Sequence, residues 1–339
     1  MNNNENGKAM KLKIYIFLIL TFTGSVALAQ QQPIYSQYMM NPYLLNPAIA
    51  GYQGITDFNL TAREQWLGYG EGPSTYAISG QTRILKTSFR NRNRMIKSKV
   101  RRRRPSGKVG IGGYIFNDMN GSIRRTGIQG TYAYHIYVRD IQFSAGVSLS
   151  AFQFKADVNP ADLYNPDIPD PLVMAGKTNA DFSPDANIGF LVSGDNFYAG
   201  LSASSLFQSS IQFGLGNSQS AYRLVRHYYL LGGYKYQERR SDYGFEPSTM
   251  ITFTEKLSWS LDLNFKTYFK ENYWAGISYR TTGTIITMFG MNYQQFYFGY
   301  AFDYSWGDIT SFNRLGSHEI MVGMRLGDSA RRYRWLNRF

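Results

Sequence analysis

Apolar and polar residues alternate along much of this chain with a period of two. The alternation is clearest in four segments, residues 141–151, 259–266, 296–304 and 319–326. A period of two places successive side chains on opposite faces of a β-strand. In the second segment Leu261 and Leu263 share one face, while Asp262 and Lys266 share the other. Each segment therefore predicts a strand with one apolar and one polar face.

The same pattern predicts fourteen strands in all. They cover residues 55–66, 75–85, 108–117, 126–138, 141–154, 185–193, 197–206, 222–236, 243–254, 258–269, 273–281, 284–293, 296–306 and 318–326. Strands of soluble sheets average about 5–6 residues, whereas these run to about ten or more, with aromatic residues recurring at their ends. The all-β pattern predicts a transmembrane antiparallel outer-membrane β-barrel of about 14 strands, rather than a secreted sandwich.

In such a barrel the apolar face meets lipid and the polar face meets the lumen. A charge placed at Leu263 should therefore impair assembly far more than a charge placed at Asn264. The polar face also carries Lys266, Arg280 and Arg325. These residues suit a water-filled interior or an interior filled by another part of the chain.

The connections between the predicted strands differ in length at the two ends of the barrel. Tight turns are predicted at 139–140, 194–196, 270–272 and 294–295, and long polar connections at 155–184, 207–221 and 307–317. Short turns are typical of the periplasmic side and long loops of the external side. The connection 86–107 is the exception, because it is long and still falls on the periplasmic side. No linker interrupts the predicted barrel, residues 55–326.

Composition excludes several classes of enzyme and metal site. The 339 residues include 27 Tyr, 23 Phe, three His and no Cys. Disulfides, thiolate metal sites and Cys nucleophiles are thereby excluded. No G-x-S-x-G stretch is present after residue 29, and the spacing of the Asp residues between 157 and 181 lacks the arrangement that wraps calcium. We expect no enzymatic activity, no cofactor and no metal.

Residues 1–29 are predicted to be a signal peptide. Lys8, Lys11 and Lys13 precede an apolar stretch that ends in Ala27-Leu28-Ala29, an A-x-A cleavage site. A membrane anchor or a buried helix is the alternative, but the apolar stretch is short for a spanning helix. Cleavage would leave Gln30 first and lower the formal net charge from +13 to +11. The protein is therefore expected to be exported and to lie in the outer membrane.

An ordered set of short motifs resembles one known family. Tyr35–Met39 (Y-S-Q-Y-M) is followed by Asn41-Pro42 and Asn46-Pro47-Ala48. Further pieces follow in order at 63–68, 72–75, 110–113, 117–121, 132–136, 165–167, 187–189, 198–202 and 318–320. Together they resemble the PorP/SprF family, outer-membrane proteins of the type IX secretion and gliding apparatus of Bacteroidota.

The resemblance implies a non-enzymatic component of the type IX protein secretion system. Such a protein would assist secretion or surface attachment of client proteins such as adhesins, and would take part in gliding motility. Its implied partners are outer-membrane lipid, periplasmic or outer-membrane subunits of the apparatus, and the secreted client. An outer-membrane pore or solute transporter is the alternative function, because fourteen strands leave a sizeable lumen.

Residues 30–54, which open the predicted mature chain, admit two readings. Pro42 and Pro47 oppose a regular helix or strand, so the segment is expected to be extended. It is either a plug in the barrel lumen or against its periplasmic rim, or a docking motif for another subunit; the two do not exclude each other. The candidate partner-binding residues are Tyr35, Ser36, Gln37, Tyr38, Asn41, Pro42, Asn46 and Pro47.

A second candidate partner-binding site is the run Arg101, Arg102, Arg103 and Arg104 in the connection 86–107. Such a block is either simply solvated, or binds an acidic partner or anionic lipid headgroups on the periplasmic side. Nucleic acid is not an expected ligand of an exported membrane protein. The basic, aromatic tail 327–339 would add charge to the same face, and an extra strand over 331–339 is left open.

Overall fold

The computed structural model describes residues 35–68, 72–84, 108–121, 123–156, 182–208, 210–213, 220–237, 241–270, 272–306 and 315–327. The chain divides into two compact units, Met1–Gln31 and Gln32–Phe339, and every described residue belongs to the second. Four predicted features lie outside the described residues. These are the signal peptide, the arginine run 101–104, the Asp-containing loop 157–181 and the tail beyond residue 327.

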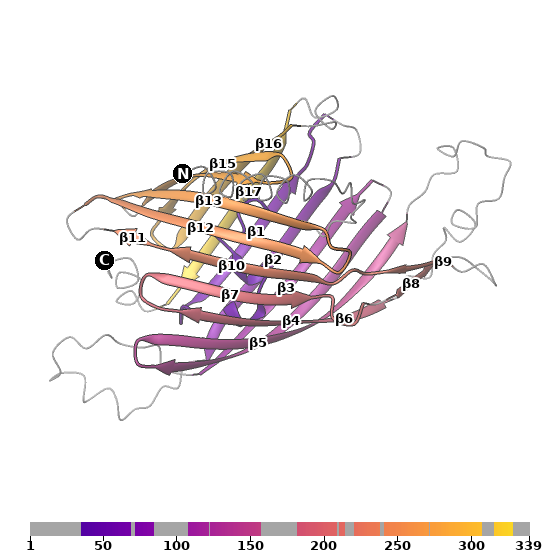
Figure 1. The fold of residues 1–339 in the computed structure, drawn as a ribbon, viewed down its shortest axis with the longest axis horizontal. Helices are drawn as coiled ribbons and strands as arrows, with labels where there is room; N and C mark the ends of the chain where they lie inside the picture. The colour runs from indigo at the N-terminus through magenta and orange to yellow at the C-terminus, as the bar shows by residue number, and fades with distance from the viewer. Residues whose placement is uncertain are drawn as a thin grey trace, which may run out of the picture. The chain divides into compact units, whose positions relative to one another are not determined.

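Fourteen antiparallel strands form a closed ring (Figure 1). They are β1 (Thr56–Glu64), β2 (Ser74–Ile84), β3 (Val109–Asn120), β4 (Ile123–Val138), β5 (Ile141–Ala156), β6 (Phe182–Ser193), β7 (Phe197–Ser204), β10 (His227–Tyr234), β12 (Tyr243–Thr254), β13 (Trp259–Phe269), β14 (Tyr273–Arg280), β15 (Thr284–Tyr293), β16 (Phe296–Ser305) and β17 (Ser317–Leu326). Pairing of β1 with β17 and of β10 with β12 closes the ring. The predicted barrel of fourteen strands is confirmed.

The sequence-based strand ends agree with the structure within a few residues, with one difference. The stretch 222–236 was expected to be one strand, but only its middle, β10, spans the barrel. Its start lies in a separate two-stranded sheet of β8 (Ser210–Phe213) and β9 (Ser220–Arg223), and its end forms the short β11 (Tyr236–Gln237) on β12. His227 pairs with the last residues of both neighbouring strands, so the ring offers no partner before it.

The two ends of the barrel differ in their connections. At the end called here the turn end, Arg139, Lys270 and Gln294 adopt positive φ angles of 55°, 47° and 52°, which allow tight reversals. The opposite end, called the loop end, carries the connections 157–181, 205–226 and 306–316 together with short reversals at 121–122 and 281–283. Ile84 pairs with Val109. The strands on either side of the connection 85–108 therefore end at the turn end, as the strand count predicts.

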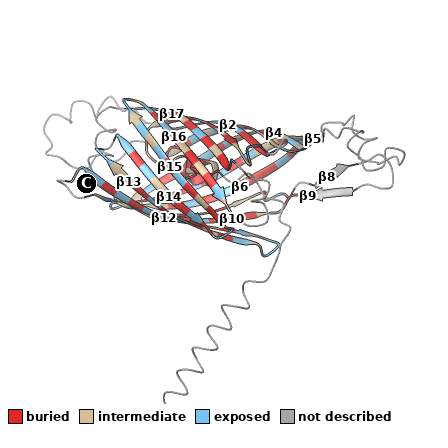
Figure 2. Ribbon diagram, turned by 90° about the horizontal axis from the view of Figure 1, so that it is seen from above, coloured by how far each residue is buried: buried red, intermediate tan, exposed pale blue. Residues whose placement is uncertain are grey.

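Apolar side chains point outward and polar side chains point inward, the reverse of a soluble protein. Leu263 and Phe265 are 49% and 46% exposed, whereas Asp262, Asn264 and Lys266 between and beside them are buried. Figure 2 shows the alternation of buried and exposed positions along the strands. The predicted faces of this strand are confirmed. No helix in the described part of the chain is both long enough and apolar enough to cross a membrane.

Candidate functional site: a segment inside the barrel

Residues 35–54, called here the inner segment, occupy the lumen. Ser36, Gln37, Asn46, Ala48 and Ala50 have no exposed surface. The segment contains two short 3₁₀ helices, η1 (Pro42–Leu44) and η2 (Pro47–Ile49), each beginning with proline. The side-chain oxygen of Asn46 accepts from the backbone N–H of Ala48 at 2.9 Å and caps the second helix. The Asn-Pro pairs therefore build compact turns where a strand or long helix cannot form. The expectation of an extended segment is wrong for residues 35–54, because each proline begins a 3₁₀ turn.

The inner segment runs along the lumen from one end of the barrel to the other. Ser36 contacts Asp303, which lies two residues from the loop end of β16. Ala50 lies against the strands near the opposite end, where its carbonyl oxygen is 2.9 Å from Nε2 of His135 on β4. The backbone N–H of Gly51 donates to Oε1 of Gln81. The segment thus fills the lumen lengthwise.

Three buried charges hold the loop-end part of the inner segment; we call Arg63, Asp303 and Glu319 the ionic clamp. The guanidinium of Arg63 lies 2.7 Å from Oδ2 of Asp303 and 3.3 Å from Oε2 of Glu319. These side chains are 4%, 2% and 0% exposed, so they have been removed from water. Buried charges are tolerated only where partners and hydrogen bonds satisfy them.

The inner segment supplies those further hydrogen bonds. The backbone N–H groups of Ser36 and Gln37 donate to the two carboxylate oxygens of Glu319 at 2.7 and 2.9 Å. The hydroxyl of Ser36 donates to Oδ2 of Asp303 and also accepts from Arg63. Since two carboxylates share one guanidinium, donors from the segment supply hydrogen bonds that Arg63 alone does not, while Nε of Arg63 and Oδ1 of Asp303 stay without a partner. The clamp and the segment therefore stabilise each other.

Polar side chains farther along the inner segment bind inward-facing groups of the strands. The amide of Asn41 donates to Ser79 at 2.9 Å, and the hydroxyls of Tyr43 and Thr131 are 2.8 Å apart. Asn46 donates to the backbone carbonyl oxygens of Phe190 and Leu201, which lie on β6 and β7. The side-chain amide of Asn46 thus hydrogen-bonds to carbonyl groups of two neighbouring strands. Six of the eight candidate residues, Tyr35, Ser36, Gln37, Tyr38, Asn41 and Asn46, hydrogen-bond to the barrel wall.

Glycines in the barrel wall make room for the inner segment. A Cβ atom on Gly110 would lie 1.9 Å from the carbonyl oxygen of Ala50, and one on Gly189 would lie 2.0 Å from Oδ1 of Asn46. Real side chains do not approach so closely. The absent side chains at Gly110 and Gly189 therefore allow the inner segment to pack directly against the wall.

We expect Gly110→Ala to loosen the turn-end part of the inner segment. The added methyl group must displace the Ala50 carbonyl, and overpacking of this kind costs roughly 1–3 kcal/mol. Limited proteolysis of the purified protein would show faster cleavage within residues 35–54. Gly113→Ala on the same strand is the matched control, because its nearest neighbour would be 3.9 Å away. Equal cleavage of the two variants would contradict the close approach.

Further charges on the lumen wall are paired. Arg280 and Asp262 form a bidentate ion pair, with distances of 2.8 and 3.0 Å. Lys266 lies 3.5 Å from Glu246. In the part of the chain that the structure describes, no group of three or more His, Cys, Asp or Glu side chains could hold a metal ion. These four charges on the wall are therefore neutralised in pairs.

Sequence reasoning named the inner segment but missed the ionic clamp. Arg63 and Glu319 stood out only as members of resembling motifs, and Asp303 was assigned only to the less apolar face of its strand. A charged residue on the inward face of a membrane strand was the available signal. It cannot tell which of the inward charges meet, because residues 63, 303 and 319 come from β1, β16 and β17.

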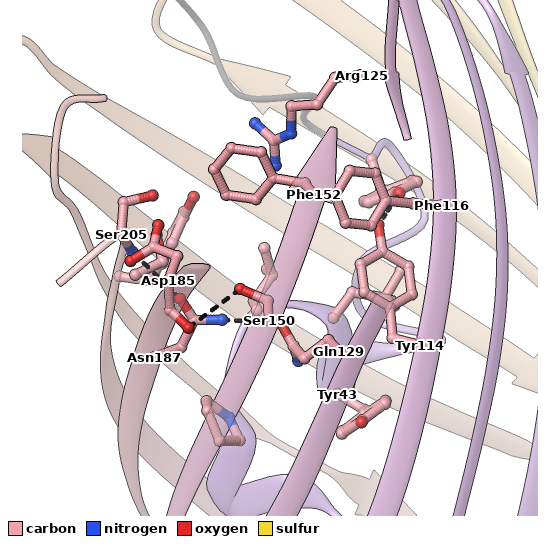
Figure 3. Close-up of a pocket in the computed structure, with 16 residues that line it drawn as sticks. Tyr43, Tyr114, Phe116, Arg125, Gln129, Ser150, Phe152, Asp185, Asn187 and Ser205 are labelled. Atoms are coloured by element: carbon pink, nitrogen blue, oxygen red, sulfur yellow. Dashed lines mark hydrogen bonds between the residues drawn. The ribbon is translucent and has the colours of Figure 1, made fainter. Parts of the chain in front are cut away.

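A small cavity remains beside the inner segment. It has a volume of about 70 Å³ and lies between Tyr35, Tyr43 and the inward side chains of β3 to β7 and β10 (Figure 3). Arg125, Phe116 and Phe152 line its loop-end side. The lumen is thus not completely filled in its loop-end half.

Comparison with known proteins gives one family match. The family described as type IX secretion system membrane protein PorP/SprF matches residues 27–324. No match was found among the curated proteins.

Several solved structures are similar in fold. The outer membrane protein Omp33 of Acinetobacter baumannii is 6% identical, with a TM-score of 0.44 over 81% of this chain and 100% of that chain. The TodX monoaromatic hydrocarbon channel is 10% identical, with a TM-score of 0.41 over 84% and 92%. BamA from Haemophilus ducreyi is 7% identical, with a TM-score of 0.39 over 80% and 70%.

Proposed function

Since this chain belongs to the PorP/SprF family of type IX secretion system membrane proteins, we propose that it assists the secretion or surface attachment of client proteins such as adhesins. It acts in the outer membrane as a non-enzymatic component, through contacts with periplasmic and outer-membrane machinery, and contributes to gliding motility. The signal peptide, residues 1–29, is removed before the barrel assembles.

The observation that carries this proposal is that the inner segment occupies most of the length of the lumen. The inner segment runs from the loop end to the turn end. Its residues Ser36, Gln37 and Asn46 are completely buried inside the barrel. A barrel filled in this way offers its two ends as contact surfaces. This arrangement favours a role in protein contacts over the alternative of an open pore or solute transporter.

The inner segment has a structural task in this proposal. Six of its eight candidate partner-binding side chains hydrogen-bond to the barrel wall, so their partner in this structure is the barrel itself. The surfaces left for the machinery are the turn end and the loop end. We propose that the turn end faces the periplasm, since short turns are typical of that side.

The run Arg101–Arg104 is proposed to contact an acidic surface of the periplasmic machinery. These residues lie outside the described part of the chain, but Ile84 and Val109 place both ends of their connection at the turn end. Replacing all four arginines with serine should leave barrel assembly intact, because no spanning strand changes. Co-purification of periplasmic partners and delivery of client should fall, and the loss should resemble that caused by high salt.

The compartment of this connection can be tested separately. The chain contains no cysteine, so Ser98→Cys introduces a single thiol within the connection. Labelling of intact cells by an impermeant maleimide would place the connection outside and reject the proposed contact. Labelling only after the outer membrane is permeabilised is the expected result. Planar-bilayer conductance of the purified protein tests the pore alternative, for which we expect no steady open channel.

A further inference from the structure

The cavity beside the inner segment contains an arginine that forms no close ion pair. Arg125 lies on β4 near the loop end, and its guanidinium carbon is 4.9 Å from the ring centre of Phe116 and 5.1 Å from that of Phe152. Its Nε atom is buried and has no hydrogen-bond partner. Among the described residues, no carboxylate lies within ion-pair distance of it.

Two carboxylates lie in the neighbourhood, and each has other hydrogen-bond partners. Asp118 pairs with Arg125 in the strand register and interacts with it electrostatically from beyond ion-pair distance, while its Oδ1 accepts from the hydroxyl of Thr75 at 2.7 Å. Asp185 lines the same cavity, but its Oδ1 accepts from the backbone N–H groups of Ala186 and Phe207 at 2.8 and 3.1 Å. The other inward charges described above form close pairs. Arg125 therefore differs from them in having no carboxylate within ion-pair distance.

The rest of the cavity suits a carboxylate that is carried on carbon. Aromatic rings of Tyr114, Phe152 and Tyr229 form apolar walls, and the amide groups of Gln129 and Asn187 add polar atoms below the guanidinium (Figure 3). An arginine fork binds carboxylate oxygens in pairs. Stacking between two phenyl rings holds that fork in place before any ligand arrives.

The size of the cavity limits what can enter. A space of about 70 Å³ admits a group about as large as one side chain. A free molecule so small would bind weakly, because the small number of its atoms limits its total binding energy. A carboxylate that belongs to a larger partner gains additional contact outside the cavity.

We propose that this cavity binds a peptide carboxylate, either an acidic side chain or a chain-terminal carboxylate, that reaches Arg125 from the loop end. The carboxylate lies on the guanidinium, and the carbon atoms that carry it lie against Phe152 and Tyr229. The inference deepens the proposed function by giving the chemistry of one client or subunit contact. The recognition of a carboxylate stands on the cavity alone.

Titration of the full-length protein in detergent micelles tests the proposal with three acetylated probes. Acetyl-Gly-Gly-Glu-amide carries an acidic side chain, acetyl-Gly-Gly-Leu a terminal carboxylate, and acetyl-Gly-Gly-Gln-amide neither. We expect at least one of the first two to bind, and the neutral probe to bind about tenfold more weakly or not at all. Which carboxylate binds identifies its source. Equal binding of the neutral probe, or equal binding of inorganic phosphate, would overturn the proposal.

Two neighbouring arginines provide matched variants. Arg125→Gln should abolish the preference for carboxylate, whereas Arg124→Gln should not, because Arg124 is exposed. Heat-modified mobility in SDS gels checks that both variants fold. If both variants lose the preference for carboxylate equally, the cavity is not the binding site. If the peptides bind but deleting the protein leaves client secretion unchanged, the proposed function fails and the carboxylate site stands. If the peptides do not bind but the deletion abolishes client secretion, only the carboxylate site is rejected.

Discussion

Replacing Arg63 with alanine is expected to release the loop-end part of the inner segment and to destabilise the folded barrel by about 3–5 kcal/mol. The substitution leaves Asp303 and Glu319 buried close to each other without their shared cation. Repulsion and the loss of charge compensation then act directly on Ser36 and Gln37, which are bound to these carboxylates. Urea unfolding monitored by tryptophan fluorescence measures the stability, and proteolysis within residues 35–54 reports the release.

A charge-neutral variant separates the ionic clamp from simple loss of packing. The triple variant Arg63→Ala, Asp303→Asn, Glu319→Gln removes the two uncompensated charges together with the arginine. We expect it to be more stable than Arg63→Ala alone. Removing all the charges of a buried ionic cluster costs less stability than removing one charge and leaving the others uncompensated. If the single and triple variants unfold at the same urea concentration, the charges do not act as described. Planar-bilayer conductance that appears in Arg63→Ala would show that the segment also closes the lumen.

Leu263→Arg is expected to reduce the amount of folded protein in the outer membrane strongly. Leu263 is near the middle of β13 and 49% exposed on the outward face, so the new charge would meet lipid hydrocarbon. The cost is roughly 2–4 kcal/mol at the midplane and falls to about 0–1 kcal/mol near the interfaces. Folded and unfolded forms in membrane fractions can be separated by heat-modified mobility.

Phe269→Arg is the control for this prediction, since Phe269 is the last residue of the same strand and also faces outward. It should assemble better than Leu263→Arg, although it loses a ring contact with Tyr243. The reverse order would contradict the assigned depth. Asn264→Arg, which the sequence favours as a harmless lumen change, is not a suitable control. Asn264 is only 5% exposed and its amide donates to the hydroxyl of Tyr38 in the inner segment, so an arginine there has no room.

The sequence alone determined the strands and their faces. A membrane barrel must pair every backbone group between strands and must alternate its side chains between lipid and lumen. Both requirements act on each strand separately, so the sequence of a single strand is enough to predict it. The bounds of β12, for example, agree with the prediction at both ends. The assignment failed at both ends of the predicted strand 222–236: the pattern continues before His227, where the neighbouring strands have ended, and after Tyr234, where the short β11 pairs with β12 alone. Pairing depends on partners that the local pattern does not contain.

Only the tertiary structure decided where the inner segment lies and which groups its side chains contact. A segment with Asn-Pro pairs fits a plug, a rim contact or a docking motif equally well, because its turns can form in each of these places. The choice depends on the inward surface of the closed ring. Arg63, Asp303 and Glu319 come together only when β1 pairs with β17, and Gly110 and Gly189 leave space only where the segment crosses them. Such contacts join residues up to 283 positions apart, a separation over which no period in the sequence carries information.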